Sequence, residues 1–151
     1  GAITWGAQQK WFGFPRAPFD VTFIKPTDID KLGTVINDQT AAVIVEPVQG
    51  EGGVRIPSVE FLQGLRKLAD EHGLLLMFDE VQTGCGRTGQ WFAYQHFGVT
   101  PDVITLAKSL CGGIAGGAIG STSASLMPND FLYTSIRIVR GFSSFALAID
   151  L

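Results

Sequence analysis

The sequence predicts an α/β fold with a mostly parallel sheet and flanking helices, and three features support this prediction. Short apolar runs recur at 41–45, 74–78 and 102–107, as in parallel strands that are buried on both faces. Segments with helical spacing or turn-forming residues separate these runs. The resulting order of strand, helix, strand, helix and strand implies right-handed crossovers, which bring the strands together in parallel.

The N-terminal part of the chain has a weaker pattern. Residues 1–18 contain aromatic residues and prolines without periodicity, and we interpret them as a lead-in loop. A short strand is expected at 19–24. A helix is expected from residue 26 to about residue 37, with Thr27 or Asp28 as its N-cap, because short polar side chains accept hydrogen bonds from the first helical amides.

From residue 41 the pattern becomes clear. A buried strand at 41–45 is followed by a glycine-rich loop at 49–53. Ser58 can cap a helix that ends at Gly73, since glycine tolerates the left-handed conformation that closes many helices. The apolar side chains expected on one face of this helix are Phe61, Leu62, Leu65 and Leu68.

The second half of the pattern repeats the first in a shorter form. A second buried strand is expected at 74–78, followed by a loop with three glycines and a short helix at 90–97 that Gly98 closes. A third strand is expected at 102–107, and a fourth is suggested at 115–119.

The composition limits the possible functions. The 151 residues include 11 Lys and Arg and 14 Asp and Glu, giving a net charge of −3 without a basic stripe, so we expect no nucleic-acid partner. No apolar run approaches the roughly 20 residues that span a bilayer, so we expect no membrane association. The two cysteines, Cys85 and Cys111, are too few for a disulfide scaffold and fit a reducing, cytoplasmic compartment.

Ionisable residues follow all three apolar runs. Glu46 comes after the first, Asp79 and Glu80 after the second, and Lys108 after the third. The carboxyl ends of parallel strands share one edge, where ligands bind, so these side chains are expected to converge. Burial there would raise the pKa of the carboxylates and lower that of the lysine, which suits a lysine nucleophile. The alternative is a structural ion pair between Lys108 and Asp79 or Glu46.

Three motifs together resemble one family. The segments Glu-Pro-Val-Gln-Gly-Glu-Gly-Gly (46–53), Phe-Asp-Glu-Val-Gln-Thr-Gly-Cys-Gly-Arg-Thr-Gly (78–89) and Thr-Leu-Ala-Lys-Ser-Leu (105–110) look like those of class III aminotransferases. These are pyridoxal 5'-phosphate enzymes of fold type I, and the fit is best to the acetylornithine/ornithine aminotransferase branch. The resemblance implies that this chain is part of the large, cofactor-binding domain of such an enzyme.

The resemblance also implies residue roles. Lys108 would hold the cofactor as a Schiff base and then shuttle a proton, and Asp79 would pair with the pyridinium nitrogen. That pairing keeps the ring protonated, as an electron sink requires. Val81 would pack on a face of the ring, and Gln82 would donate a hydrogen bond to its phenolic oxygen.

Two further acids have implied roles in the same family. Glu51 resembles a gating glutamate that pairs with a substrate-binding arginine, and Glu46 would support Asp79 from behind, unless it is only a structural strand-end charge. The implied reaction moves an amino group from an amino acid such as acetylornithine or ornithine to 2-oxoglutarate. Arginine biosynthesis and a cytoplasmic homodimer are implied with it.

The resemblance covers about residues 1–118, which we expect to form the central part of the large domain. Residues 119–151 depart from the family pattern and are expected to be a tail of different character. The family's phosphate-binding loop and C-terminal small domain have no counterpart here, which predicts a partial chain. A catalytically incomplete α/β fragment is therefore the first alternative function.

A dinucleotide-binding domain is the second alternative. Gly84, Gly86 and Gly89 formally match the GxGxxG fingerprint, with Asp102 near the position of the ribose-binding acid. The context is poor, because five residues separate the strand from the first glycine and Asp102 precedes a strand instead of following one. No His or Cys pair has metal-ligand spacing, so no metal site is expected.

Overall fold

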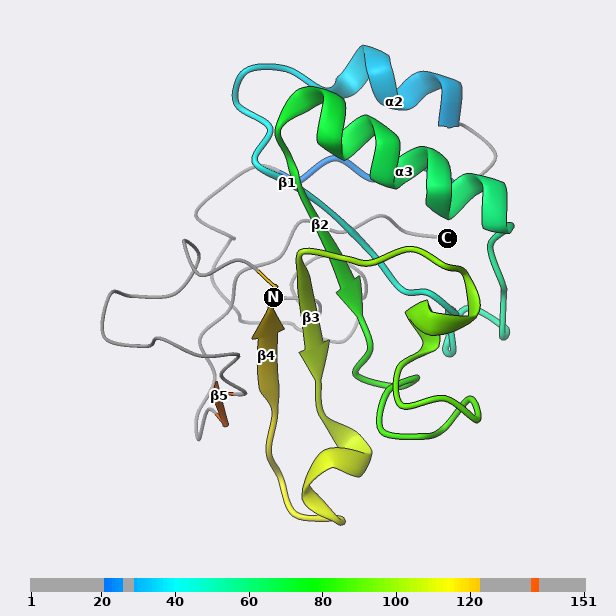
Figure 1. Ribbon diagram of the computed structural model, residues 1–151, viewed down its shortest axis with the longest axis vertical. Coiled ribbons are helices and arrows are strands. Elements are labelled where there is room, and N and C mark those ends of the chain that lie inside the picture. The colour runs from blue at the N-terminus through cyan, green and yellow to red at the C-terminus, as the bar shows by residue number, and fades with distance from the viewer. Residues whose placement is uncertain (1–20, 26–28, 123–136, 139–151) are drawn as a thin grey trace, which may run out of the picture.

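The computed structural model describes residues 21–25, 29–122 and 137–138, and these form a sheet with helices packed on it (Figure 1). The strands lie in the order in which they occur along the chain. They are β1 (Ala42–Val45), β2 (Leu75–Asp79), β3 (Val103–Leu106), β4 (Ala118–Ser121) and β5 (Arg137–Ile138). The α-helices are α2 (Ile29–Val35) and α3 (Val59–His72), and the 3₁₀ helices are η3 (Ala93–His96) and η4 (Lys108–Cys111).

The sheet is parallel where the sequence predicts parallel strands. β1 pairs with β2 and β2 with β3 in parallel, whereas β4 runs antiparallel to β3 and β5 antiparallel to β4. Figure 1 shows the arrows of β2 and β3 pointing one way and that of β4 the other. The predicted α/β fold is confirmed, and the expected fourth strand is present at Ala118–Ser121. Its direction is reversed because Gly112 and Gly113, with φ of 60° and 97°, turn the chain back after η4.

The helix α3 covers β1 and β2, and α2 packs against α3 (Figure 1). The predicted caps of α3 are confirmed: the Ser58 hydroxyl accepts a hydrogen bond from the Phe61 amide at 3.1 Å, and Gly73 ends the helix with φ of 65°. The helix places three fully buried side chains on the sheet: Leu62, Leu65 and Ala69. Since each buried leucine contributes about 1.5–3 kcal/mol, this face stabilises the contact strongly.

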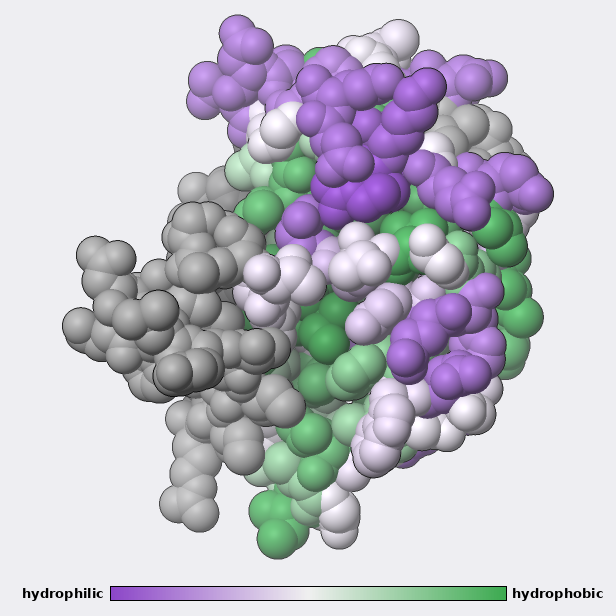
Figure 2. Space-filling view, in the orientation of Figure 1, coloured by the Kyte–Doolittle hydropathy of each residue, from purple (hydrophilic) through white to green (hydrophobic). Residues whose placement is uncertain are grey.

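The surface reflects this layering. Figure 2 shows hydrophilic residues gathered over α2 and α3, away from the sheet. Hydrophobic residues reach the surface at the lower end of the view, over the segment that joins β3 to β4, where Ile114 is 77% exposed. None of the helices in the described parts of the chain combines the length and the apolar character needed to span a membrane.

Three predicted elements differ from the structure. The strand expected at 19–24 is absent from its described part, because residues 21–25 pair with no strand and Phe23 is 40% exposed. The helix expected to run to about residue 37 is described from Ile29 and ends slightly earlier, at Val35. The helix expected at 90–97 is one 3₁₀ turn, Ala93–His96, although Gly98 follows it with φ of 63° as expected.

Some expectations fall on residues outside the described ranges. These are the lead-in loop at 1–18, the caps Thr27 and Asp28, and most of the tail at 119–151. Within that tail the structure describes residues 119–122, of which 119–121 complete β4, and the two residues of β5. The predicted site residues all lie between 46 and 108, within the continuously described range.

Candidate active site

The predicted ionisable residues share one edge of the sheet. Glu46 directly follows β1, Asp79 ends β2, and Lys108 lies two residues beyond β3. The three strands are adjacent and parallel, with Val45 in register with Phe78 and Asp79 in register with Thr105. Neighbouring strands lie about 4.8 Å apart, so these residues come together at the carboxyl edge. The expectation that they lie on one edge is confirmed.

The Asp79 carboxylate is held by two hydrogen bonds. Its Oδ1 atom accepts a bond from the Val81 backbone amide and another from the Thr105 hydroxyl, both at 3.0 Å. Among the described residues, Oδ2 has no hydrogen-bond partner. Asp79 is half-buried, so its second oxygen is fixed in place and remains able to accept a proton donor.

Lys108 begins η4 in a strained backbone conformation. Its φ of 40° lies in the left-handed region, which costs a residue other than glycine roughly 1–3 kcal/mol. Its Nζ atom donates a hydrogen bond to Oε1 of Gln82. Lys108 forms no ion pair with Asp79 or Glu46 among the described residues, so the structural ion pair considered above is not formed.

The expectation of a buried Lys108 is wrong for this chain. The residue lies beyond the end of β3 on a surface turn, and its side chain is exposed. The strand β3 stops at Leu106, before the end of the apolar run in the sequence, so the sheet does not enclose the lysine. The amine therefore reaches the edge of the sheet from the solvent side.

The glycine-rich loop after β1 packs on Gln82. A Cβ atom at Gly50 would lie 2.1 Å from Nε2 of Gln82, so only glycine leaves the amide in its present place. The Gly50 amide donates a hydrogen bond to Oε2 of Glu46 at 3.3 Å, which fixes the start of the loop. Glu46, Gly50, Gln82 and Lys108 thus form a continuous series of contacts across the three strand ends.

Glu46 has a perturbed acidity. Burial raises the pKa of Glu46 above its ordinary value, and the nearby charges of Asp79 and Glu51 act in the same direction. The Gly50 amide and the Lys108 amine partly offset this effect. The predicted rise of the carboxylate pKa is confirmed for this residue. Glu51 lies on an exposed turn.

Glu80 has a role that sequence reasoning missed. Its side chain is only 1% exposed, and its carboxylate accepts hydrogen bonds from the Thr83 hydroxyl at 2.6 Å and from the Ala93 and Tyr94 amides at 2.9 and 2.8 Å. These bonds fasten the loop after β2 and the start of η3 to the strand end. A signal was available, because the inward alternation of Leu76 and Phe78 continues to residue 80.

The glycine loop at 84–89 does not form a dinucleotide site with Asp102. The Asp102 carboxylate accepts hydrogen bonds from Nη1 of Arg66 and from the Leu76 amide, both at 2.8 Å. It precedes β3 and therefore lies at the amino edge, opposite Lys108. Burial lowers the pKa of Arg66, but the hydrogen bonds to Asp102 and Asp70 outweigh it, so the net shift is upward and the ion pair is structural.

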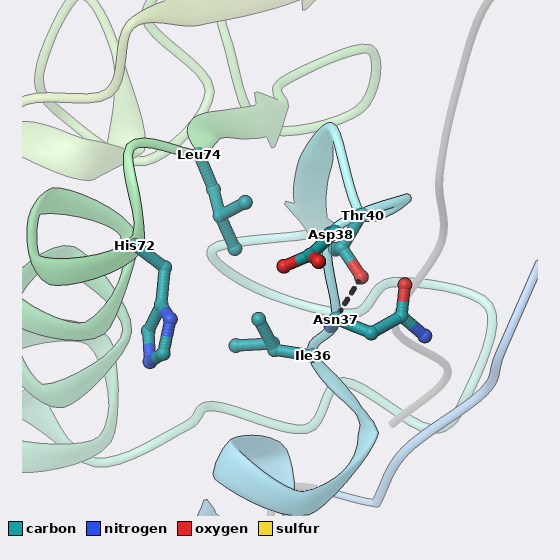
Figure 3. Close-up of a pocket in the computed structure, with 6 residues that line it drawn as sticks. All are labelled: Ile36, Asn37, Asp38, Thr40, His72 and Leu74. Atoms are coloured by element: carbon teal, nitrogen blue, oxygen red, sulfur yellow. Dashed lines mark hydrogen bonds between the residues drawn. The ribbon is translucent and has the colours of Figure 1, made fainter.

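A surface hollow of about 270 Å³ also lies at the amino edge (Figure 3). It is lined by Ile36, Asn37, Asp38, Thr40, His72 and Leu74. In Figure 3 the His72 ring and the Asp38 carboxylate lie on opposite sides, and the Thr40 hydroxyl accepts a hydrogen bond from the Asn37 amide at 3.0 Å. The hollow contains none of the predicted site residues. No group of three metal-ligating side chains occurs within the described ranges.

The carboxyl edge of the parallel strands thus carries an amine, an amide and a carboxylate. The chain belongs to the class-III aminotransferase family, because the model of that family matches residues 8–128. Members of this family use pyridoxal phosphate. The resemblance seen in the three motifs is thereby confirmed.

Individual relatives of this chain are also aminotransferases. The chain is 51% identical to the acetylornithine aminotransferase of Vibrio vulnificus over 122 residues, which is 80% of this chain and 30% of that protein. Its fold resembles an (S)-enantioselective omega-transaminase from Thermomicrobium roseum, with 34% identity, a TM-score of 0.65, and coverage of 74% of this chain and 30% of the other.

The ornithine aminotransferase of Toxoplasma gondii is 35% identical, with a TM-score of 0.64, covering 80% of this chain and 30% of the other. That structure holds pyridoxal phosphate at partial occupancy in its active site. The chain thus spans about 30% of the length of the relatives it matches.

Proposed function

We propose that this chain acts as an aminotransferase, or as part of one, that moves an amino group from an amino acid such as acetylornithine or ornithine to 2-oxoglutarate. Residues 1–118 would contribute the central part of the cofactor-binding domain, and residues 119–151 a separate tail. The observation that carries the proposal is the contact between Lys108 and Gln82 beside the half-buried Asp79. Family membership and the acetylornithine and ornithine aminotransferase relatives support the reaction class.

The side chains at the carboxyl edge fit pyridoxal phosphate by their chemistry. Lys108 offers a primary amine, Gln82 an amide whose oxygen already reaches that amine, and Asp79 a carboxylate oxygen without a partner among the described residues. When bound, pyridoxal phosphate supplies an electron sink that stabilises negative charge at the substrate Cα. An anionic carboxylate beside the ring nitrogen favours its protonated form, which strengthens that sink.

Each residue then has a task. Lys108 would hold the cofactor through Nζ, and its amine would serve as the base that moves the proton from the substrate Cα. Asp79 would accept a hydrogen bond from the protonated ring nitrogen through Oδ2 and so favour the protonated ring. The Val81 side chain, next to Asp79, would pack on a face of the ring, and the Gln82 amide would donate a hydrogen bond to the phenolic oxygen.

The two remaining acids act on the substrate side and behind the cofactor. Glu51, which lies on an exposed turn, would pair with a substrate-binding arginine, and this would let one site accept both amino donor and 2-oxo acid. Glu46 supports the site by fixing the Gly50 amide. The same family resemblance favours a cytoplasmic homodimer and a place in arginine biosynthesis.

Covalent trapping tests the proposal. The full-length protein is incubated with pyridoxal phosphate, reduced with borohydride, digested and mapped by mass. We expect one dominant label on Lys108, none in a Lys108→Ala variant, and an unchanged label in a matched Lys67→Ala variant, since the Lys67 side chain is 78% exposed on α3. Labelling spread evenly over surface lysines, unaltered by Lys108→Ala, would refute the proposed function.

A further inference from the structure

Asp79 has a neighbour whose role no motif indicates. The Thr105 hydroxyl donates to Oδ1 of Asp79 at 3.0 Å, and the Val81 amide donates to the same oxygen. Both donors therefore use one carboxylate oxygen and leave Oδ2 without a partner among the described residues. Because the last torsion of an aspartate side chain is broad, one donor alone defines the direction of Oδ2 poorly.

The sheet fixes the position of Thr105. Thr105 is the register partner of Asp79 in the parallel pair of β2 and β3, and its carbonyl oxygen accepts a hydrogen bond from the Glu80 amide at 3.0 Å. Register partners on adjacent strands place their side chains on the same face of the sheet. A β-branched threonine also has a restricted first torsion, so its hydroxyl is held in place.

We infer that Thr105 is a positioning residue for the transamination site: its hydroxyl occupies Oδ1 of Asp79 and so turns Oδ2 toward the protonated nitrogen of an aromatic ring. This inference rests on the proposed function. Thr105 lies three residues before Lys108 on the same strand and turn. One short segment therefore orients the acid and supplies the amine, which ties their relative placement to the end of β3.

Substitutions that remove or keep the hydroxyl test this role in the full-length protein. Thr105→Val keeps the shape and removes the donor, and Thr105→Ser keeps the donor. Thr34→Val is the matched control, because the Thr34 hydroxyl bonds to the Lys31 carbonyl on α2, far along the chain from the site. The measurements are thermal unfolding, the dissociation constant of pyridoxal phosphate, kcat and KM for the amino donor, and borohydride labelling.

A hydrogen bond to a charged group is strong enough that Thr105→Val should weaken cofactor binding and lower kcat by about tenfold each. KM and labelling of Lys108 should change little, and the unfolding temperature should fall by a few degrees, as expected for the loss of one hydrogen bond. Thr105→Ser and Thr34→Val should stay within about twofold of wild type, as for substitutions that break no special contact.

The inference is overturned if Thr105→Val matches wild type in both kcat and the dissociation constant of pyridoxal phosphate. It is also overturned if Thr105→Ser loses as much cofactor affinity and kcat as Thr105→Val. In either case labelling of Lys108 leaves the proposed function intact. Absence of a Lys108 label in the wild-type protein would instead refute the proposed function, and this inference would fail with it.

Discussion

Replacing Glu80 by alanine should release the loop after β2 from the end of the strand. The Glu80 carboxylate is 1% exposed and accepts three hydrogen bonds, two of them from the first amides of η3. Alanine at this position leaves the Ala93 and Tyr94 amides without their acceptor. The loop between them and β2 carries Val81 and Gln82, so its loss of order bears directly on the candidate site.

The structure sets the size of the effect. Each amide loses a bond to a charged acceptor, which is worth about 1.5–3 kcal/mol. Since about 1.4 kcal/mol corresponds to a factor of ten, amide hydrogen exchange at Ala93 and Tyr94 should accelerate about ten- to a hundredfold. In the wild-type protein the three hydrogen bonds also offset the free-energy cost of burying the charged Glu80 carboxylate.

Hydrogen exchange of the full-length protein, followed by mass spectrometry or NMR, measures this directly. Glu71→Ala is the matched control: its carboxylate makes only a loose surface pair with Lys67 at 3.8 Å, which contributes less than about 1 kcal/mol. Exchange in α3 should be unchanged in both variants. Wild-type exchange rates at Ala93 and Tyr94 in the Glu80→Ala protein would show that the carboxylate does not hold this loop.

Three further outcomes follow from contacts described above. Gly50→Ala should push the flexible Gln82 amide away from Lys108 and lower transaminase activity without much loss of stability. Gly33→Ala is the control, because it has open space around it and should stabilise α2 by about 0.5–1 kcal/mol. Equal transaminase activities of the Gly50→Ala and Gly33→Ala variants would contradict this prediction. Because burial raises the pKa of Glu46, its stabilising contribution is full below about pH 4.5 and is lost as pH rises through the raised value. Glu46→Gln should therefore gain stability over wild type across that window in chemical unfolding, and a gain confined to lower pH would disprove the sign. Asp102→Ala should lower the unfolding free energy by about 2–3 kcal/mol, since two charge-assisted bonds are lost, while leaving cofactor affinity unchanged.

The parts of the fold with local signals could be predicted from sequence. The helix between Ser58 and Gly73 was predictable because both caps and the apolar face are short-range features. The buried strands were predictable because short, unbroken apolar runs are typical of parallel strands that are buried on both faces. Their shared edge, and with it the grouping of Glu46, Asp79 and Lys108, then follows from parallel topology alone.

Features that depend on distant neighbours could not be predicted in this way. Whether the segment at 19–24 is a strand depends on a pairing partner that no local pattern reveals, and the direction of β4 depends on the turn before it. The exposure of Lys108 depends on where β3 stops. Thr105 looked like an ordinary β-branched strand residue, because its bond to Asp79 requires the register between two strands.

The backbone conformation of Lys108 lowers the stability of the fold, whereas the proposed reaction requires a lysine at this position. With φ of 40°, this is a position where glycine relieves strain, so Lys108→Gly should fold at least as well as the natural chain. A stabilisation campaign guided only by melting temperature would therefore tend to select glycine here and discard the one amine on which the proposed reaction depends. Screens of this protein need an activity criterion beside the thermal one.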